Sequence, residues 1–279
     1  MKRNIQLRTL PIILQLFLIV VAIVQLYPLF WLVTTSFKSN LEIMGANPLG
    51  LPHSWKWSNY EYALFGTQLA RNFLNSLTYT AVAVIVSSLL SAMVSFAVMR
   101  MKWKLSKWVV IFFMLGLMIP VHATLLPLFL MLKHTSLLDT PWALIIPYTA
   151  AALPTTIFIL NGFFAALPRE LEEAGVVDGC SIYGVFFRIM LPLTKPALVT
   201  TAIFTLLNTW NELMFAITFI NKPELMTLTV GIQSLQGVYS AEYGAIAAGM
   251  VLATAPVLIA YIFLSRQVQS SIIAGAIKG

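Results

Sequence analysis

The sequence predicts an all-α protein that crosses a membrane several times. Of its 279 residues, 59% are hydrophobic and only 10% are charged, and its mean hydropathy is +0.87. A soluble domain carries about 25% charged residues, so a water-soluble fold could not cover this much apolar surface. Six apolar segments each reach the ~20 residues that a membrane helix needs. The single cysteine, Cys180, excludes an internal disulfide and a cysteine-based metal cluster.

We expect one transmembrane domain over residues 1–279. Its helices should cover about 10–34, 73–99, 108–131, 141–164, 196–220 and 244–265. The first segment is too long for a signal peptide and lacks a well-placed cleavage site, so we expect an uncleaved helix. Residues 38–70 are rich in Pro, Gly, Asn and Trp and predict an irregular outer loop with short helical pieces. Within it, Trp55, Trp57 and Tyr60 are typical of anchors at the membrane surface.

Several prolines interrupt the predicted helices. Proline removes a backbone hydrogen bond and kinks a helix. In lipid, the freed carbonyls must be satisfied by neighbouring groups or by cavity water. The kinks indicate either a bundle that moves or encloses a path, or static bends that improve packing. The prolines concerned are Pro120, Pro127, Pro147, Pro154 and Pro256.

The distribution of Lys and Arg predicts the orientation in a bacterial-type cell membrane. With the N-terminus in the cytoplasm, twelve fall inside: Lys2, Arg3, Arg8, Arg100, Lys102, Lys104, Lys107, Arg169, Arg188, Lys195, Arg266 and Lys278. Five fall outside: Lys38, Lys56, Arg71, Lys133 and Lys222. The positive-inside rule therefore favours two cytoplasmic termini. Residues 165–195 then face the cytoplasm, and so does the polar tail 266–279.

The cytoplasmic segment begins with a short acidic helix. Pro168 suits the first turn of a helix, where its missing N–H costs nothing. The acidic residues that follow then lie near the positive end of the helix dipole. These residues are Glu170, Glu172 and Glu173, and the turn signal Asp178-Gly179 ends the helix.

A second, amphipathic helix should follow. Ser181 can cap it, the run IYGVFFRIM forms it, and Leu191-Pro192 should end it before the fifth membrane helix. Such a projection suits docking into a groove of another protein. The alternative is a solvated loop that only reverses the chain.

The spacing in this segment resembles the EAA loop of ABC importer permeases. Three residues separate Glu173-Ala174-Gly175 from Gly179. Nine residues separate Gly179 from Ile189, and one residue separates Ile189 from Leu191-Pro192. Gly175 stands where the family usually has a second alanine, and glycine costs up to about 1 kcal/mol of helix propensity. The flanking runs NGFFAALPRELEEAG, 72-NFLNS-76, 208-NTWNELMFA-216 and 274-AGAIKG-279 are similar to the carbohydrate-uptake branch, of the maltose-permease MalG type. The resemblance covers nearly the whole chain.

The resemblance implies the MetI-like fold, with six helices and a cytoplasmic coupling helix. It implies a permease subunit of an ATP-driven importer for sugars, with oligosaccharides expected. The implied partners are a second permease, an ATPase dimer that binds ATP and Mg, and an extracytoplasmic sugar-binding protein; no nucleic acid is expected. The ATPase contact would be carried by Glu172, Glu173, Ala174, Gly175, Asp178 and Gly179.

We expect neither a cofactor nor catalysis in this chain itself. A phosphate-binding loop needs the pattern G-x-x-x-x-G-K-[ST], which the sequence lacks. The three histidines, His53, His122 and His134, are single and scattered, so we expect no metal cluster.

Polar residues inside the fifth predicted helix are candidates for the solute path. An ionisable group at membrane depth is costly unless it is paired or wetted. Asn208, Asn211 and Glu212 are spaced to share one helix face. They either line the translocation path, with Trp210 nearby, or clamp helices together.

Two other polar residues fall at helix depth. His122 faces a cavity or bonds a carbonyl of a broken helix. Asn161 is expected to be a packing residue.

Two other functions stay open from the sequence. One is an importer of the same architecture for a polyol or a glycerol-phosphate-like solute. The other is an ion-coupled secondary carrier, which would need intramembrane charges to hold the coupling ion. Glu212 is the candidate for that charge.

Overall fold

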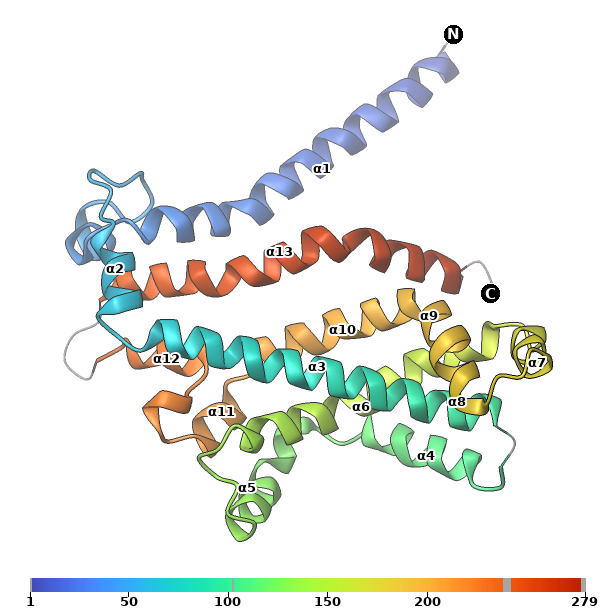
Figure 1. The fold of residues 1–279 in the computed structure, drawn as a ribbon. Helices are drawn as coiled ribbons and strands as arrows, with labels where there is room; N and C mark the ends of the chain where they lie inside the picture. The colour runs from blue at the N-terminus through green and yellow to red at the C-terminus, as the bar shows by residue number, and fades with distance from the viewer. Residues whose placement is uncertain (1, 102, 238–241, 277–279) are drawn as a thin grey trace. The chain divides into compact units, whose positions relative to one another are not determined.

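The computed structural model describes residues 2–101, 103–237 and 242–276 (Figure 1). Lys102 and Lys278, which the orientation argument counted, lie outside the described residues. Contacts group the chain into two compact units. Unit 1 comprises residues 1–70 and 232–254, and unit 2 comprises residues 71–231 and 255–279. Each unit is discontinuous in sequence, and the single transmembrane domain over residues 1–279 stays a prediction.

Unit 1 holds the first long helix and residues 38–70, the segment predicted to lie outside (hereafter the outer segment). Helix α1 (Lys2–Thr35) contains the predicted helix 10–34. The π-helix η1 (Glu42–Ala46) and helix α2 (Ser58–Phe65) follow, so residues 38–70 do form irregular chain with short helical pieces, as predicted. The first part of α13 (Tyr243–Ala276) also belongs to this unit.

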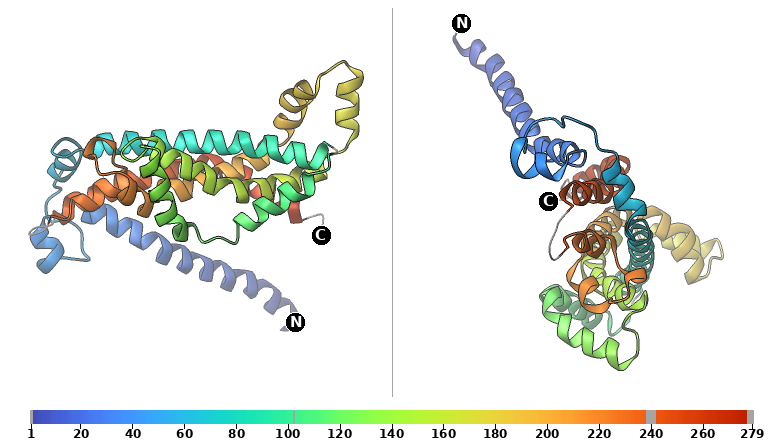
Figure 2. Two further views of the ribbon diagram at one scale, coloured as in Figure 1. Left: turned by 90° about the horizontal axis from the view of Figure 1, so that it is seen from below. Right: turned by 90° about the vertical axis from the view of Figure 1, so that its left-hand side faces the viewer.

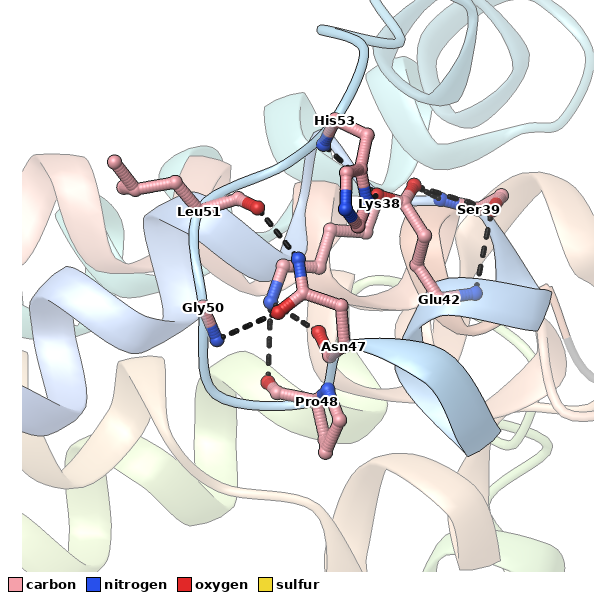
Figure 3. Close-up of polar contacts among 8 residues, drawn as sticks. All are labelled: Lys38, Ser39, Glu42, Asn47, Pro48, Gly50, Leu51 and His53. Atoms are coloured by element: carbon pink, nitrogen blue, oxygen red, sulfur yellow. Dashed lines mark hydrogen bonds and ion pairs between the residues drawn. The ribbon is translucent and has the colours of Figure 1, made fainter.

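A network of polar contacts fixes the outer segment (Figure 3). The Lys38 ammonium is fully buried and donates to the carbonyl oxygens of Asn47 and Pro48, at 2.9 and 3.1 Å. The Glu42 carboxylate accepts from the backbone N–H and ring Nδ1 of His53, at 2.9 and 2.8 Å. The backbone N–H of His53 is the main cause that lowers the pKa of Glu42 to about 2. The outer segment is therefore held by its own polar groups.

The three predicted membrane anchors differ in their surroundings. Trp55 and Trp57 meet Phe37 edge-on, with ring centroids 5.0 and 4.8 Å apart, and both remain exposed. Tyr60 instead forms a hydrogen bond of 2.8 Å between its hydroxyl and Ser36 Oγ, so its polar end is already satisfied. Anchoring at a membrane surface stays a prediction for all three residues.

Unit 2 is a helical bundle. Its long helices are α3 (Leu69–Arg100), α6 (Trp142–Ala166) and α10 (Lys195–Trp210), together with the later part of α13. Pro147 and Pro154 lie inside α6 and Pro256 inside α13, as predicted. Among the described residues, four helices are long and apolar enough to cross a membrane. The number reaches six if each of two sharply bent helix pairs forms one span, but the second pair, Ile182–Leu193 with Lys195–Trp210, is not the predicted helix 196–220.

The prediction of a helix over 108–131 is wrong as to its continuity, and the break falls at Pro120, one of the prolines expected to kink the predicted helices. The structure has α4 (Ser106–Gly116), the 3-10 helix η2 (Val121–Thr124) and α5 (Leu125–His134), with a bend of 95° between the two arms. Pro120 is extended, with ψ of 121°, and it has no N–H with which to continue the hydrogen-bond ladder of α4. Pro127 falls in the first turn of α5, where proline is tolerated.

The prediction of one continuous helix over 196–220 is also wrong. Helix α10 ends at Trp210, and α11 (Met214–Phe219), the 3-10 helix η4 (Pro223–Leu225) and α12 (Leu228–Ser234) follow. Asn211 caps α10, and its side-chain amide donates to the Leu207 carbonyl at 2.8 Å. Asparagine competes in this way with the main-chain ladder, so Asn208, Asn211 and Glu212 do not share one continuous helix face.

The segment 165–195, which is predicted to be cytoplasmic, contains the two predicted helices. Helix α7 (Glu170–Val177) ends at a turn in which Gly179 has φ of +81°, a conformation that favours glycine. The second helix comprises α8 (Ile182–Gly184), the π-helix η3 (Val185–Met190) and α9 (Leu191–Leu193). Ser181 caps it as predicted, because Ser181 Oγ accepts from the Gly184 N–H at 3.3 Å.

Two details of this segment differ from the prediction. Pro192 does not end the second helix, since it stands in the first turn of α9, where a missing N–H costs little. The chain instead bends by 73° between Leu193 and Lys195. Pro168 precedes α7, outside its first turn, because the N-cap is Arg169.

Candidate functional site

Unit 2 has a partly open cavity of about 770 Å³ beside the break after α10. Helices α6 and α10, the 3-10 helix η2 and the start of α11 form its walls. A cavity of this size accommodates a small organic molecule. Its lining residues are Val121, His122, Tyr148, Ala151, Ala152, Thr155, Thr156, Thr201, Phe204, Thr205, Leu207, Asn208, Thr209, Asn211, Glu212, Leu213, Met214 and Phe215.

The cavity wall combines uncharged polar groups with apolar surface. Asn208 and Asn211 are both exposed, and side-chain amides can donate and accept hydrogen bonds. Five threonines line the wall, and Glu212 is the one charged residue among the lining residues given above. Amides and hydroxyls with an aromatic face, here Phe204 or Phe215, suit an uncharged solute that carries many hydroxyl groups.

The Glu212 carboxylate is occupied by protein groups. Its Oε1 accepts from the Phe215 N–H at 2.8 Å, and its Oε2 accepts from the Ala216 N–H at 3.2 Å and from the Tyr148 hydroxyl at 2.9 Å. Thr229 donates to the Glu212 carbonyl at 3.0 Å. Glu212 thus closes the helix break and joins α6 to α11. This geometry is that of the clamp, one of the two alternatives weighed from the sequence, although the residue also borders the cavity.

Of the other candidate residues, one lines the cavity and two do not. Trp210 is buried and meets Phe73 edge-on at 5.7 Å, and it does not line the cavity. His122 does line it, with its ring 6.0 Å from that of Phe215; within the described part of the chain its side chain makes no hydrogen bond to a carbonyl. Asn161 lies outside the cavity lining, and its buried Oδ1 has no hydrogen-bond partner among the described residues.

The sequence argument missed several lining residues. Thr201, Thr205 and Thr209 recur at helical spacing on one face of α10, a signal present in the sequence. Tyr148 gave no such signal, because its partner Glu212 is 64 residues away.

Helix α7 lies at one end of unit 2 (Figure 2, left view), and its exposed residues are both charged and apolar. Of the six residues predicted for the ATPase contact, four are exposed: Glu173, Ala174, Asp178 and Gly179. Val176 and Val177 are also exposed, at 61% and 86%. Exposed valines beside a carboxylate form a surface that an apolar groove with a basic rim would fit.

Gly175 faces inward and is buried. A Cβ atom at this position would lie 2.5 Å from Ile189 Cδ1 and 3.3 Å from Val185 Cγ2. The glycine therefore lets α7 approach η3 closely. This contact explains why the chain has glycine where the resemblance leads one to expect alanine.

The second helix is packed into the bundle. Phe186 of η3 lies 5.2 Å from Phe96 of α3, between ring centroids, and belongs with Phe164 of α6 to one buried apolar cluster. The solvated-loop alternative does not describe this segment, because η3 is part of the core of unit 2.

Glu172 also faces inward, toward Arg100 at the end of α3. The two side chains form an ion pair, and they are only 20% and 4% exposed. Arg100 also donates from Nη1 to the carbonyl oxygens of Phe164 and Leu167, at 3.1 and 3.0 Å, and from Nη2 to that of Pro168, at 3.2 Å. The sequence argument counted Arg100 only toward the orientation, because nothing near it in sequence marks this partner.

Comparison with known proteins gives a consistent result. A family described as "Binding-protein-dependent transport system inner membrane component" matches residues 87–273. YurM of Bacillus subtilis, described as a probable ABC transporter permease protein, is 35% identical over 95% of this chain and 87% of its own length. The diacetylchitobiose uptake system permease protein NgcG of Streptomyces coelicolor is 33% identical over 94% of this chain and 87% of its own length.

A solved structure has the same fold. One chain in the crystal structure of a bacterial ABC transporter involved in the import of the acidic polysaccharide alginate superposes with a TM-score of 0.82. The alignment covers 93% of this chain and 96% of that chain, at 20% sequence identity.

Proposed function

Because this chain belongs to the family of inner membrane components of binding-protein-dependent transport systems, we propose that it is the permease subunit of an ATP-driven sugar importer. The chain is a multi-pass membrane subunit and a transport component, and it is not an enzyme. The predicted fold class, an all-α permease of the MetI-like type, is confirmed.

The observation that carries the proposal is the surface of α7. Four residues of the EAA-like stretch are exposed there, while the adjoining Gly175 and Glu172 anchor the helix to the bundle. A helix with one face anchored and the opposite face free can transmit a push from a second protein. We assign the free face to contact with an ATPase dimer that binds ATP and Mg. Glu173 then meets a basic or N–H-rich edge of the ATPase groove.

The cavity in unit 2 supports a role in the solute path. Asn208 and Asn211 are exposed in its wall, where the Asn211 amide nitrogen also donates to the Leu207 carbonyl, and the threonines of α10 that line it are buried. Relatives named for sugar uptake, such as NgcG, favour an oligosaccharide as the solute. A second, homologous permease would complete the path, and an extracytoplasmic sugar-binding protein would deliver the sugar. ATP binding would close the ATPase dimer and open the path outward, and hydrolysis would return it inward.

The test is a charge reversal on the free face of α7. Glu173→Lys should reduce ATPase co-purification with the affinity-tagged chain at least tenfold, since a reversed charge at a docking surface costs several kcal/mol. Binding-protein-dependent uptake should fall in parallel, while the amount of the chain in the membrane stays unchanged. Glu170→Gln, at an exposed position of the same helix, is the matched control. Unchanged ATPase capture and uptake by the Glu173→Lys variant would refute the assignment of this surface.

A further inference from the structure

We propose that Arg100 is the positioning residue that makes α3, α6 and the coupling helix α7 move as one body. This inference rests on the proposed function, because it concerns how force applied to α7 reaches the membrane helices. It assigns Glu172 to an internal anchor, and no longer to the surface that meets the ATPase.

The contacts of Arg100 span three elements. The residue is the last of α3, and its Nε pairs with Glu172 in the first turn of α7. Its Nη1 bonds two carbonyls at the end of α6, those of Phe164 and Leu167. Its Nη2 bonds the carbonyl of Pro168, in the link between α6 and α7. One guanidinium thus joins the ends of two membrane helices to the start of the cytoplasmic helix.

The chemistry of this site requires arginine. The carbonyls at the end of a helix lack intrahelical donors and carry the negative end of the helix dipole. A guanidinium presents five donors in a planar fork and stays charged, whereas a lysine ammonium is a point charge with three donors. With its side chain only 4% exposed, Arg100 has little water available to replace a lost partner. Removing one partner of this ion pair therefore costs more here than it would on an open surface, because it leaves the other charge buried and unpaired.

The arrangement gives α7 a rigid connection that its chain link alone does not supply. Gly175 and Ile189 fix the far part of α7 against η3, and Arg100 fixes its first turn against α3 and α6. A displacement of α7 is then carried to both membrane helices, and not absorbed by residues 167–169.

Two substitutions separate the parts of the anchor. Glu172→Gln removes the charge of one partner and leaves the three carbonyl bonds of Arg100 in place. Arg100→Gln leaves Glu172 unpaired and removes the donors of all three carbonyls, so its effect should be the larger. Arg188→Gln is the matched control, because Arg188 lies exposed on η3 of the same segment.

The experiment uses the full transporter, purified through a tag on this chain and reconstituted with its partner subunits. Spin labels are placed at the exposed positions Met101 and Glu170 after Cys180 is replaced by serine. The distance between the labels should be the same in the nucleotide-free and the ATP-vanadate states of the otherwise unaltered chain. In the Arg100→Gln variant the distance distribution should broaden or shift with nucleotide. Solute uptake per ATP hydrolysed should fall about tenfold, a usual size for a coupling effect.

Each outcome decides the proposal. If Arg100→Gln and Glu172→Gln give the same label distances and the same uptake per ATP as Arg188→Gln, the anchor does not transmit force. If Arg100→Gln fails to assemble, Glu172→Gln decides alone: partial uncoupling supports the proposal, and values equal to the control overturn it. ATPase capture by the unaltered chain is measured in parallel, and its absence would reject the proposed function and not the anchor.

Discussion

At the scale of single residues, Gly175 stands where the family pattern has alanine, and its packing gives a physical reason for this difference. From the sequence, glycine within α7 looked like a cost in helix propensity. In the structure it lies against Ile189, whose Cδ1 atom occupies the space that a Cβ would need. The two residues therefore form a complementary pair, and the effect of replacing Gly175 depends on the side chain at position 189.

The pair predicts non-additive stability. In the unaltered chain, Gly175→Ala should raise the thermal unfolding midpoint little or not at all, because the gain in helix propensity is offset by displacement of Ile189. In an Ile189→Val background, which lacks the obstructing methyl, Gly175→Ala should stabilise by about 0.5–1 kcal/mol. Thermal unfolding of the four proteins in detergent measures this coupling. Additive midpoints would show that the close approach of α7 to η3 is not limiting.

Glu212 and Asn208 should separate the structural from the solute-facing role. Glu212→Ala leaves the Tyr148 hydroxyl and two backbone N–H groups without an acceptor, so unfolding should become easier by about 2 kcal/mol or more. Asn208→Ala removes an exposed amide from the cavity wall and should leave the unfolding midpoint unchanged while lowering uptake. Unfolding in detergent and uptake by whole cells check the pair. A lowered midpoint for Asn208→Ala with normal uptake would reverse these assignments.

At the scale of elements, the outer segment predicts a pH dependence. Its Glu42 has a pKa lowered from 4.5 to about 2, chiefly by the backbone N–H of His53. A lowered folded-state pKa means that the stabilisation is complete above the ordinary pKa and is lost as the pH falls toward 2. The difference in unfolding midpoint between the unaltered chain and Glu42→Gln should therefore be constant from pH 7 to about 5 and shrink at lower pH.

A neighbouring carboxyl gives the control for this titration. Glu61 is exposed on α2, so Glu61→Gln should show no such dependence. A Glu42→Gln difference that does not change with pH would mean that the ionised carboxylate is not what holds His53 and Ser39.

The broken helices mark the limit of what the apolar pattern predicts. Hydropathy gives the ends of α3 and α6 to within a few residues, because each is one uninterrupted run. It does not show the breaks after α4 and after α10, where apolar residues continue through the turn. Pro120 was visible in the sequence as a kink, but the 95° bend also depends on packing. At the second break Asn211 and Glu212 supply bonds that the main chain lacks, and only the structure shows their partners.

At the scale of the whole molecule, the charge distribution predicts a defined orientation. In a Cys180→Ser background, Trp57→Cys should react with a membrane-impermeant maleimide in intact cells, because Trp57 is 63% exposed in the outer segment. Asp178→Cys should react only in inverted vesicles, as the positive-inside rule requires. The opposite labelling pattern would place α7 outside the cell and would remove the basis for contact with an ATPase.

The coupling segment was more predictable than the cavity for a physical reason. Caps and turns such as Ser181 and Gly179 act within a few residues, so their signals are local in the sequence. The cavity and the Arg100 anchor join residues more than 60 positions apart. No periodicity encodes such pairs, and the sequence therefore indicated Glu212 without Tyr148 and Glu172 without Arg100.

The contacts of Arg100 have a consequence for how this chain can diverge. Three of its four acceptors are main-chain oxygens, which every amino acid provides. Leu167 and Pro168 can consequently be replaced by other residues without loss of an acceptor. Arg100 cannot be replaced in this way, because its side chain supplies all the donors. Among related sequences, the arginine at position 100 should therefore be invariant, while the residues at positions 167 and 168 should vary.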